Sequence, residues 1–239
     1  MTRQVRVPMA GLAPGDRTLS PEQVRYLVGV HRLRAGDAFL AFDPRAAVES
    51  DGVLLSPAKV RLGELREAPV VPARAVTWIH AMLKGDKCDA IVRDAAELGA
   101  TQVVFVQTAR VVAKADEKKL GARVERWVRI AEEAARQCGR GDSPPVAVRS
   151  SWEAALSEAD AATHRFCLHP GAPPLRDALL AVRESAPLVF AAGPEGGFTD
   201  EEVAAARAHG FTVCSIGPLV LRTETVPAAV LGAVAVLLG

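Results

Sequence analysis

The sequence predicts an α/β protein: a mostly parallel sheet with helices on both faces, preceded by a smaller β-rich domain. From about Ala75 onward, apolar runs typical of buried strands alternate with segments whose apolar residues follow the helical period. This alternation is typical of parallel sheets covered by helices on each side. Before Pro72, short apolar stretches are instead separated by turn pairs such as Asp51-Gly52, which favours a small β-barrel or sandwich. We therefore expect one domain in residues 1–71 and a second in residues 72–239.

The first domain is expected to contain one helix and several short strands. Ser20 is a suitable N-cap and Pro21 a suitable first helical residue, so a helix should begin there and continue to about Val30. The apolar stretches 38–42 and 53–55 are the clearest strands.

The second domain is expected to alternate regularly between strands and helices. The predicted strands are residues 75–82, 101–108, 146–148, 165–168, 188–192 and 212–216. The predicted helices are residues 86–98, 118–137 and 175–185, a short one capped by Ser150 and Glu153, one that begins after Thr199, and a last one after Thr225. The last helix is apolar all round, so it should be buried in the core or against a second subunit.

Two glycine-containing loops of the second domain each lie between a predicted strand and a predicted helix. The first is residues 193–197, GPEGG, after which Thr199 and Glu202 form a capping box. The second is residues 217–225, GPLVLRTET. Ligands of open parallel sheets bind beyond the carboxyl ends of the strands, so two such loops side by side indicate a site. Ordinary tight turns are the alternative, but each loop carries a glutamate and the second also carries an arginine.

Composition places the chain among cytoplasmic globular proteins. It has 239 residues, of which 49% are hydrophobic and 24% charged, and its net charge is +1. The N-terminus has no apolar segment of the signal-peptide kind, and the apolar run 226–238 is too short to span a bilayer. The four cysteines, Cys88, Cys138, Cys167 and Cys214, are far apart and lack metal-ligand spacing, so we expect reduced thiols and no metal site.

Positive charge is concentrated in two regions of the chain. Residues 1–34 hold six arginines against two acidic residues, and residues 110–149 hold ten basic residues against six acidic ones. Residues 150–239 hold five arginines against ten acidic residues. Two basic regions in a nearly neutral chain favour a polyanionic partner, although the second region can equally form a solvated helix face.

Five motifs together resemble one known family. They are AELG at 96–99, QCGR at 137–140, LHP at 168–170, GPEGG at 193–197 and IGPLVLRTET at 216–225. With these motifs in this order, the chain is similar over nearly its whole length to the bacterial 16S rRNA uracil-N3 methyltransferases of the SPOUT superfamily. The resemblance implies a C-terminal trefoil-knot domain and an N-terminal PUA-like β-barrel. It also implies a homodimer that binds S-adenosylmethionine (SAM) and methylates N3 of a uridine in the 16S rRNA of the small ribosomal subunit.

The loops beyond the strand ends supply what this cofactor needs, namely polar backbone groups and an apolar wall around the sulfonium. The expected cofactor-binding residues are Leu168, His169, Pro170, Gly193, Pro194, Glu195, Gly196, Gly197, Ile216, Gly217, Leu219 and Leu221. For His169 we expect the contact to come from the backbone rather than from the imidazole.

Methylation at N3 requires that the N3 proton leave and that the charge spreading onto O2 and O4 be stabilised. Glu195 and Glu224 are the candidate proton acceptors, and Arg222 is the candidate cationic donor. Glu224 can equally be an acidic residue at a helix N-terminus, and Arg222 can pair with either glutamate. Water can also take the place of a side-chain base.

Arginines of the basic regions are expected to contact RNA phosphates. The candidates are Arg3, Arg6, Arg32, Arg110, Arg136 and Arg140. A flipped uridine would also need a surface on which to stack, and Phe198 is the aromatic residue nearest in sequence to the site.

Two other functions remain open at the level of sequence. The chain can be a noncatalytic RNA-binding module in ribosome assembly that retains the fold, or a SPOUT enzyme that acts on tRNA or on a ribose 2′-hydroxyl. The intact GPEGG and LRTET loops argue against the first alternative, and binding of SAM would test it.

Overall fold

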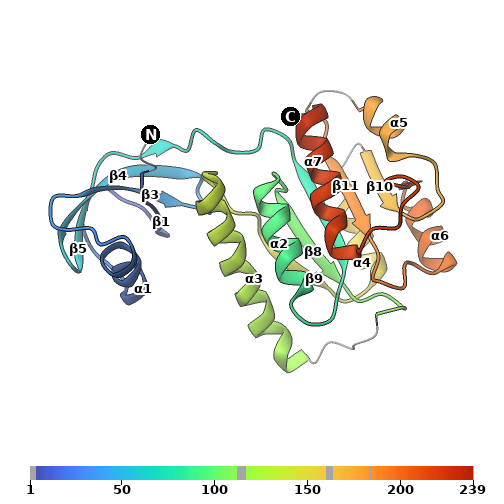
Figure 1. Ribbon diagram of the computed structural model, residues 1–239, viewed down its shortest axis with the longest axis horizontal. Helices are drawn as coiled ribbons and strands as arrows, with labels where there is room; N and C mark the ends of the chain where they lie inside the picture. The colour runs from blue at the N-terminus through green and yellow to red at the C-terminus, as the bar shows by residue number, and fades with distance from the viewer. Residues whose placement is uncertain (1–3, 112–116, 160–163, 183–184, 239) are drawn as a thin grey trace. The chain divides into compact units, whose positions relative to one another are not determined.

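The computed structural model describes residues 4–111, 117–159, 164–182 and 185–238, with the backbone alone for residues 117–119. The chain forms two compact units, whose elements are labelled in Figure 1. Unit 1 contains residues 1–71 and 135–143, and unit 2 contains residues 72–134 and 144–239. The segment 135–143, which includes the last residues of helix α3, thus packs with the N-terminal part although it lies far along the sequence.

Unit 1 is built on a six-stranded sheet. Its strands are β1 (Arg6–Pro8), β2 (Gly15–Thr18), β3 (Ala38–Asp43), β4 (Val48–Ser56), β5 (Lys59–Leu62) and β6 (Arg66–Glu67). The strand order is β1-β3-β4-β5-β2 with β6 beside β4, and every pair is antiparallel except β1 with β3. Apolar side chains such as Leu27, Phe39 and Leu54 form the core of this unit.

The helix predicted in unit 1 is present, but it changes geometry after one turn. Ser20 and Gln23 form a capping box at the start of α1 (Pro21–Val24). The helix continues as a π-helical turn, η1 (Arg25–Val30). Arg32 follows in the left-handed region with a φ of 56°. The extent of the helix therefore agrees with the sequence prediction, whereas no residue pattern marks the π turn.

The closed β-barrel expected for this unit is not found. Within the described residues no pairing joins the edge strands β1 and β2, so the sheet is open. Turn residues indicated correctly that short strands occur here. Whether a sheet closes depends on strand tilt and stagger, which those residues do not encode.

Unit 2 contains a second six-stranded sheet in which every pair is parallel. Its strands are β7 (Val76–Ala81), β8 (Gln102–Val106), β9 (Val146–Arg149), β10 (His164–Leu168), β11 (Leu188–Ala192) and β12 (Thr212–Cys214). Their order is β12-β10-β11-β7-β8-β9. The first three strands in sequence fill one half of the sheet and the last three fill the other. This arrangement places a topological switch point between β7 and β11.

Helices cover both faces of this sheet, as predicted. Side chains of α2 (Lys87–Glu97), α3 (Glu117–Cys138), α5 (Leu175–Leu180) and α7 (Val226–Leu238) pack into one apolar core, and those of α4 (Trp152–Leu156) and α6 (Asp200–Ala208) pack into the other. The 3-10 turns η2 (Ser157–Ala159) and η3 (Thr223–Thr225) follow α4 and precede α7. Figure 1 shows α2 and α7 side by side over the same face.

Several element boundaries in unit 2 differ from the sequence prediction. Helix α4 is capped by Ser151 rather than Ser150, because the Ser151 hydroxyl accepts the N–H of Ala154. Helix α5 ends at Leu180, short of the predicted residue 185, and β12 ends at Cys214. Beyond Cys214, Ser215 forms only an isolated bridge with Pro174, so the apolar run does not continue as a strand.

Helix α7 is only partly covered within this chain. Val230, Leu231 and Val234 are buried, but Val236 and Leu237 are 85% and 50% exposed. Cover of this surface by a second subunit therefore remains a prediction. None of the described helices is both long enough and apolar enough to span a bilayer.

Candidate active site

The loops that follow β10, β11 and β12 surround one cavity of about 840 Å³. Its volume is within the range of about 300–1,000 Å³ that is typical of ligand pockets. The two glycine loops were expected on neighbouring strands, but β10 lies between β11 and β12. The loops still meet, because the hydroxyl of Thr223 in the second loop donates a 2.6 Å hydrogen bond to the carbonyl of Gly193 in the first.

Nearly all of the residues that were predicted to bind the cofactor line the cavity. Its lining includes Leu168, His169, Pro170, Gly193, Pro194, Glu195, Gly197, Ile216, Gly217, Leu219 and Leu221, together with Arg222 and Glu224. Gly196 is not part of the lining. Its carbonyl instead accepts a 2.9 Å hydrogen bond from the guanidinium of Arg110. The geometry thus brings the predicted residues together, while their roles in binding stay a prediction.

Glycine is required at two positions of the first loop. A Cβ on Gly193 would lie 3.2 Å from backbone atoms of Gly197 and Phe198, and Gly197 itself has a φ of 69°. The turn is closed by a 2.8 Å hydrogen bond from the N–H of Gly197 to the carbonyl of Pro194. Helix α6 begins directly afterwards, and the predicted capping box of Thr199 and Glu202 is present. The loop is therefore fixed at both ends.

Phe198, the aromatic residue considered for base stacking, is only 2% exposed. Its ring packs against that of Trp152, with centroids 4.7 Å apart. In this structure Phe198 therefore supports the first loop from the apolar core and does not present an open face to a base.

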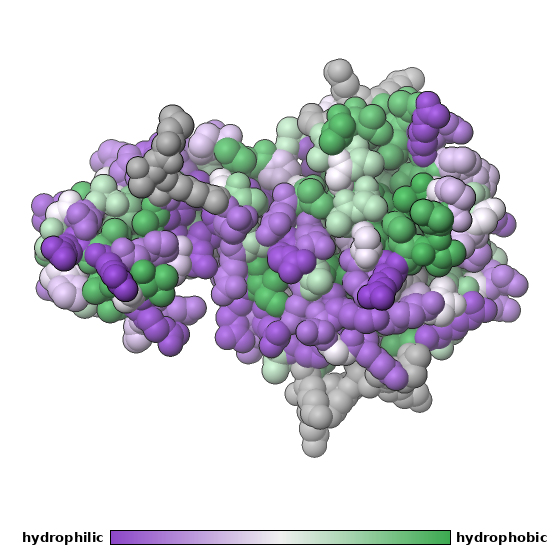
Figure 2. Space-filling model, in the orientation of Figure 1, coloured by the Kyte–Doolittle hydropathy of each residue, from purple (hydrophilic) through white to green (hydrophobic). Residues whose placement is uncertain are grey.

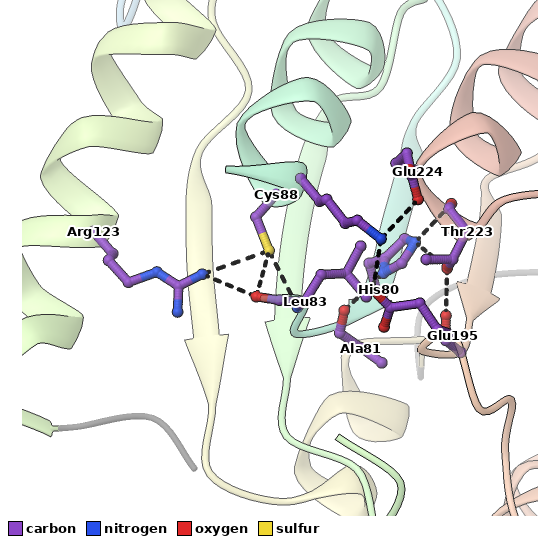
Figure 3. Close-up of polar contacts among 10 residues, drawn as sticks. His80, Ala81, Leu83, Cys88, Arg123, Glu195, Thr223 and Glu224 are labelled. Carbon is purple, nitrogen blue, oxygen red and sulfur yellow. Dashed lines mark hydrogen bonds and ion pairs between the residues drawn. The ribbon is translucent and has the colours of Figure 1, made fainter. Parts of the chain in front are cut away.

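A buried histidine at the end of β7 contacts Thr223 of the second loop. His80 has no exposed surface, and its Nδ1 lies 2.8 Å from the carbonyl oxygen of Ala81. Its Nε2 lies 3.3 Å from both the carbonyl oxygen and Oγ1 of Thr223 (Figure 3). Burial lowers the pKa of His80, although hydrogen bonds to Ala81 and Thr223 and the charges of two nearby glutamates oppose this effect. The neutral ring thus links the sheet to Thr223, and Thr223 links it to Gly193.

Two carboxylates and an ammonium group meet at the cavity wall. Glu195 and Glu224 come from different loops and lie close together in Figure 3. The Nζ of Lys87 donates a 2.8 Å hydrogen bond to Oε1 of Glu195 and lies 3.6 Å from Oε2 of Glu224. The hydrogen bond from Lys87 lowers the pKa of Glu195 and raises that of Lys87.

Lys87 lines the cavity but was not among the residues predicted from the sequence. No motif marks it. A topological signal existed, because Lys87 begins the helix that follows β7, and the carboxyl end of β7 faces the same sheet edge as β11.

Arg222 is exposed at the cavity, and none of the described residues forms an ion pair or hydrogen bond with its guanidinium. The alternative in which Arg222 pairs with Glu195 or Glu224 is therefore not observed. Lys87 forms the ion pairs with both glutamates instead. Leu219 and Val220, in the same loop, are 77% and 81% exposed.

The arginines predicted to bind RNA differ in how they are held. Arg140 is buried and forms a 2.8 Å ion pair with Asp142, and Arg6 donates to the carbonyl of Arg140 while lying over the ring of Phe42. Arg32 is exposed, and Arg136 lies half-buried with its guanidinium 4.2 Å from the ring centroid of Tyr26. Arg110 is exposed beside the first loop, whereas Arg3 lies outside the described residues.

No cluster of histidine, cysteine, aspartate or glutamate suited to a metal ion occurs in the part of the chain that the structure describes. The four cysteines are free thiols, and burial raises the pKa of Cys167 and of Cys214 to about 12.

Residues 71–235 match a protein family described as the RNA methyltransferase domain. The chain belongs to this family. Members similar to it along most of their length include the ribosomal RNA small subunit methyltransferase E of Bacillus subtilis, which is 31% identical over 91% of this chain and 88% of the relative. The protein of the same name from Synechocystis is 34% identical over 92% of this chain and 73% of the relative.

Solved structures agree with this family assignment. A protein of Legionella pneumophila, described as a methyltransferase and solved with SAM bound, superposes with a TM-score of 0.89 at 27% identity and covers 98% of both chains. A ribosomal RNA small subunit methyltransferase E from Neisseria gonorrhoeae, solved with S-adenosyl methionine, superposes with a TM-score of 0.83 at 26% identity, again over 98% of both chains. The similarity to these structures covers unit 1 as well as unit 2, whereas the family match covers residues 71–235.

Proposed function

We propose that this protein is a SAM-dependent methyltransferase that methylates N3 of a uridine in the 16S rRNA of the small ribosomal subunit. The observation that carries the proposal is the meeting of both glycine loops, two glutamates, Lys87 and Arg222 in one cavity. Relatives that share most of their length with this chain are named for the small-subunit rRNA, and two similar structures hold SAM.

The residues of the cavity fit SAM. Glycine at 193 allows the backbone of Gly197 and Phe198 to pack closely against it, and this packing shapes the loop that lines the cavity. Leu168, Leu219 and Leu221 provide an apolar wall, and backbone groups of the three loops provide polar contacts. When bound there, SAM supplies a methyl group on a positively charged sulfur. The residues expected to hold it are those predicted from the sequence that line the cavity, which from the 193–197 loop are Gly193, Pro194, Glu195 and Gly197.

The side chains at the wall suit the chemistry of a uracil N3. Glu195 and Glu224 provide carboxylate oxygens that can accept the proton lost from N3. Arg222, which has no ion-pair partner among the described residues, provides a cation that can stabilise the negative charge spreading onto O2 and O4 of the base. The loops hold the reacting groups in place, and positioning of this kind supplies much of the rate of an in-line transfer.

RNA would be held by the cations that remain accessible. Arg32, Arg110 and Arg136 keep exposed or partly exposed guanidinium groups, whereas Arg6 and Arg140 are committed to contacts inside unit 1. We therefore assign phosphate contacts to the first group and expect Arg6 and Arg140 to support the fold of the RNA-binding unit. Arg3 stays a candidate from the sequence alone.

The finer features of the family are part of this proposal. A trefoil knot in unit 2 is supported by the return of residues 216–225 to Gly193, and a PUA-like role for unit 1 is supported by its antiparallel strands. A homodimer is supported by apolar surface over α7 and the second loop, which Figure 2 shows and to which Val236, Leu219 and Val220 contribute. Light scattering of the purified protein tests the dimer.

Nucleoside analysis tests the proposed reaction. Small subunits from a strain that lacks this protein should contain no 3-methyluridine at the target position, and incubation with the protein and SAM should restore it. Restoration by an Arg222→Ala variant to the wild-type level would contradict the catalytic assignment. Persistence of 3-methyluridine in the deletion strain, with loss of a tRNA or 2′-O-methyl modification instead, would favour the other SPOUT activities. Calorimetry that detects no SAM binding would favour a noncatalytic module.

A further inference from the structure

We propose that Lys87 is a positioning residue that gives the two carboxylates of the cavity different roles. Its ammonium group holds Glu195 as a fixed anion and leaves the carboxylate of Glu224 to accept the uridine proton. The inference rests on the proposed methyl transfer to N3 and identifies which of the two candidate acceptors performs it.

The two glutamates differ in how their oxygens are bound. Glu195 is 46% exposed at its side chain, and its Oε1 already accepts the 2.8 Å hydrogen bond from Lys87. Glu224 is 23% exposed at its side chain, and its Oε2 is shielded from solvent without a hydrogen-bond partner among the described residues. Lys87 thus occupies an oxygen of Glu195, whereas its contact with Glu224 is the longer 3.6 Å ion pair. Glu224 is therefore the better placed acceptor.

Glu224 is also held more firmly along the chain. It lies in η3 next to Thr223, whose hydroxyl is bonded to Gly193 and whose carbonyl and hydroxyl oxygens both approach the buried His80. A general base must stay within hydrogen-bond reach of the proton that it removes. The contacts of Thr223 fix the backbone from which Glu224 projects.

Lys87 attracts the Glu224 carboxylate electrostatically but binds it less closely than it binds Glu195. At 3.6 Å its ammonium is close enough to attract the Glu224 carboxylate without forming the short hydrogen bond that it makes with Glu195. The other titratable groups facing this carboxylate are Glu195 on the β11–α6 loop and the neutral His80 on β7, and the cation Arg222 precedes it by two residues. Removal of Lys87 would leave the two carboxylates facing each other without a cation between them.

Loss of this cation has a consequence for the rate. Without Lys87, Glu195 is no longer held by its hydrogen bond, and two anions face each other at the cavity wall. Transfer should therefore be slower in Lys87→Met, whereas Lys87→Arg keeps the charge and should retain most of the rate.

The test is single-turnover transfer from radiolabelled SAM to unmodified small subunits. Glu224→Gln should lose about a hundredfold or more of the rate, the contribution of a general base, while Glu195→Gln should keep most of it. Lys87→Met should slow the transfer, and Lys87→Arg should restore most of the rate. Lys84→Met is the matched control, because Lys84 is exposed in the segment before α2 and does not line the cavity; its rate should equal that of the wild type.

Two results would overturn the assignment: a greater loss in Glu195→Gln than in Glu224→Gln, or a wild-type rate in Lys87→Met. Thermal unfolding of each variant shows whether it is folded, and if Lys87→Met is not, the comparison of the two glutamine variants still decides. Failure of the proposed function looks different, because the wild-type protein itself would then form no 3-methyluridine.

Discussion

His80 and Thr223 lie 143 residues apart in the sequence, yet the Nε2 of His80 is 3.3 Å from the hydroxyl oxygen of Thr223 in the interior of unit 2. The same hydroxyl donates to the carbonyl of Gly193. One threonine side chain thus joins the end of β7 to both loops of the cavity. Because Arg222 and Glu224 flank Thr223, this contact also fixes the position of the two candidate catalytic side chains.

Replacement of His80 should show whether the contact with Thr223 positions the loop. The side-chain amide of asparagine can replace only the Nδ1 contact of the ring with Ala81. The longer side chain of glutamine can place its amide near Thr223, where Nε2 lies in the wild type. We expect His80→Asn to lower the free energy of unfolding by about 1–3 kcal/mol, the cost of leaving a buried polar group without its partner, and to weaken SAM binding. His80→Gln should retain more of both, as measured by chemical denaturation and calorimetry.

The Thr223→Ser variant is the control for this prediction, since it keeps the hydroxyl. If His80→Asn and His80→Gln prove equally impaired, the ring contributes by filling space and not through Thr223.

Gly193→Ala should impair the cavity without unfolding the protein. The added Cβ would lie 3.2 Å from two backbone atoms, and backbone cannot yield as a side-chain end can. We expect the affinity for SAM to fall about tenfold or more, equivalent to ~1.4 kcal/mol, as measured by calorimetry. Gly121→Ala, where no atom lies within 4 Å of the added Cβ, is the matched control and should bind SAM normally. Unchanged affinity in Gly193→Ala would show that this backbone can move without affecting the ligand.

Arg222→Ala should abolish most turnover while leaving the affinity for SAM nearly intact. The guanidinium is exposed and makes no ion pair among the described residues, so its removal leaves no buried partner unsatisfied. Loss of a group that stabilises charge only during the reaction costs about 10²–10³ in rate. Single-turnover kinetics and calorimetry separate the two effects, and equal losses in both would place Arg222 in the cofactor site.

Local patterns predicted the secondary structure of the site well. The strand 188–192, the capping box at Thr199 and the glycine loops follow from short-range preferences, and the structure contains all of them. The position of β10 between β11 and β12 did not follow, because strand order is set by packing between distant segments.

The charged and buried partners of the site were less predictable. Lys87 and His80 act through contacts with residues more than a hundred positions away, and neither lies in a motif. Arg6 and Arg140 show a second limit of inference from sequence. Their positive charge suggested RNA contacts, but sequence does not show that Arg140 pairs with Asp142 and that the Arg140 carbonyl binds Arg6.

Asp43 should make unit 1 sensitive to acid. Burial alone would raise the pKa of Asp43, but hydrogen bonds from the N–H groups of Arg45, Gly11 and Ala46 outweigh burial and bring the pKa below the ordinary 3.8. A carboxyl whose pKa is lower in the folded state stabilises that state fully above its unfolded pKa and loses this effect as pH falls through the folded value. The difference in free energy of unfolding between wild type and Asp43→Asn should thus be largest near neutral pH and shrink in acid. A difference that does not vary with pH would contradict this account.

The arginines of unit 1 should separate into two classes when each is changed to alanine. Arg32 is exposed, so Arg32→Ala should weaken RNA binding, reduce the slope of log affinity against log salt by about one unit, and leave the thermal midpoint nearly unchanged. Arg140→Ala should instead lower the midpoint, because it leaves the partly buried Asp142 without its ion-pair partner. Filter binding at several salt concentrations and thermal unfolding distinguish the classes. A stable Arg140→Ala protein with the reduced salt slope would return Arg140 to the RNA contacts that its charge first suggested.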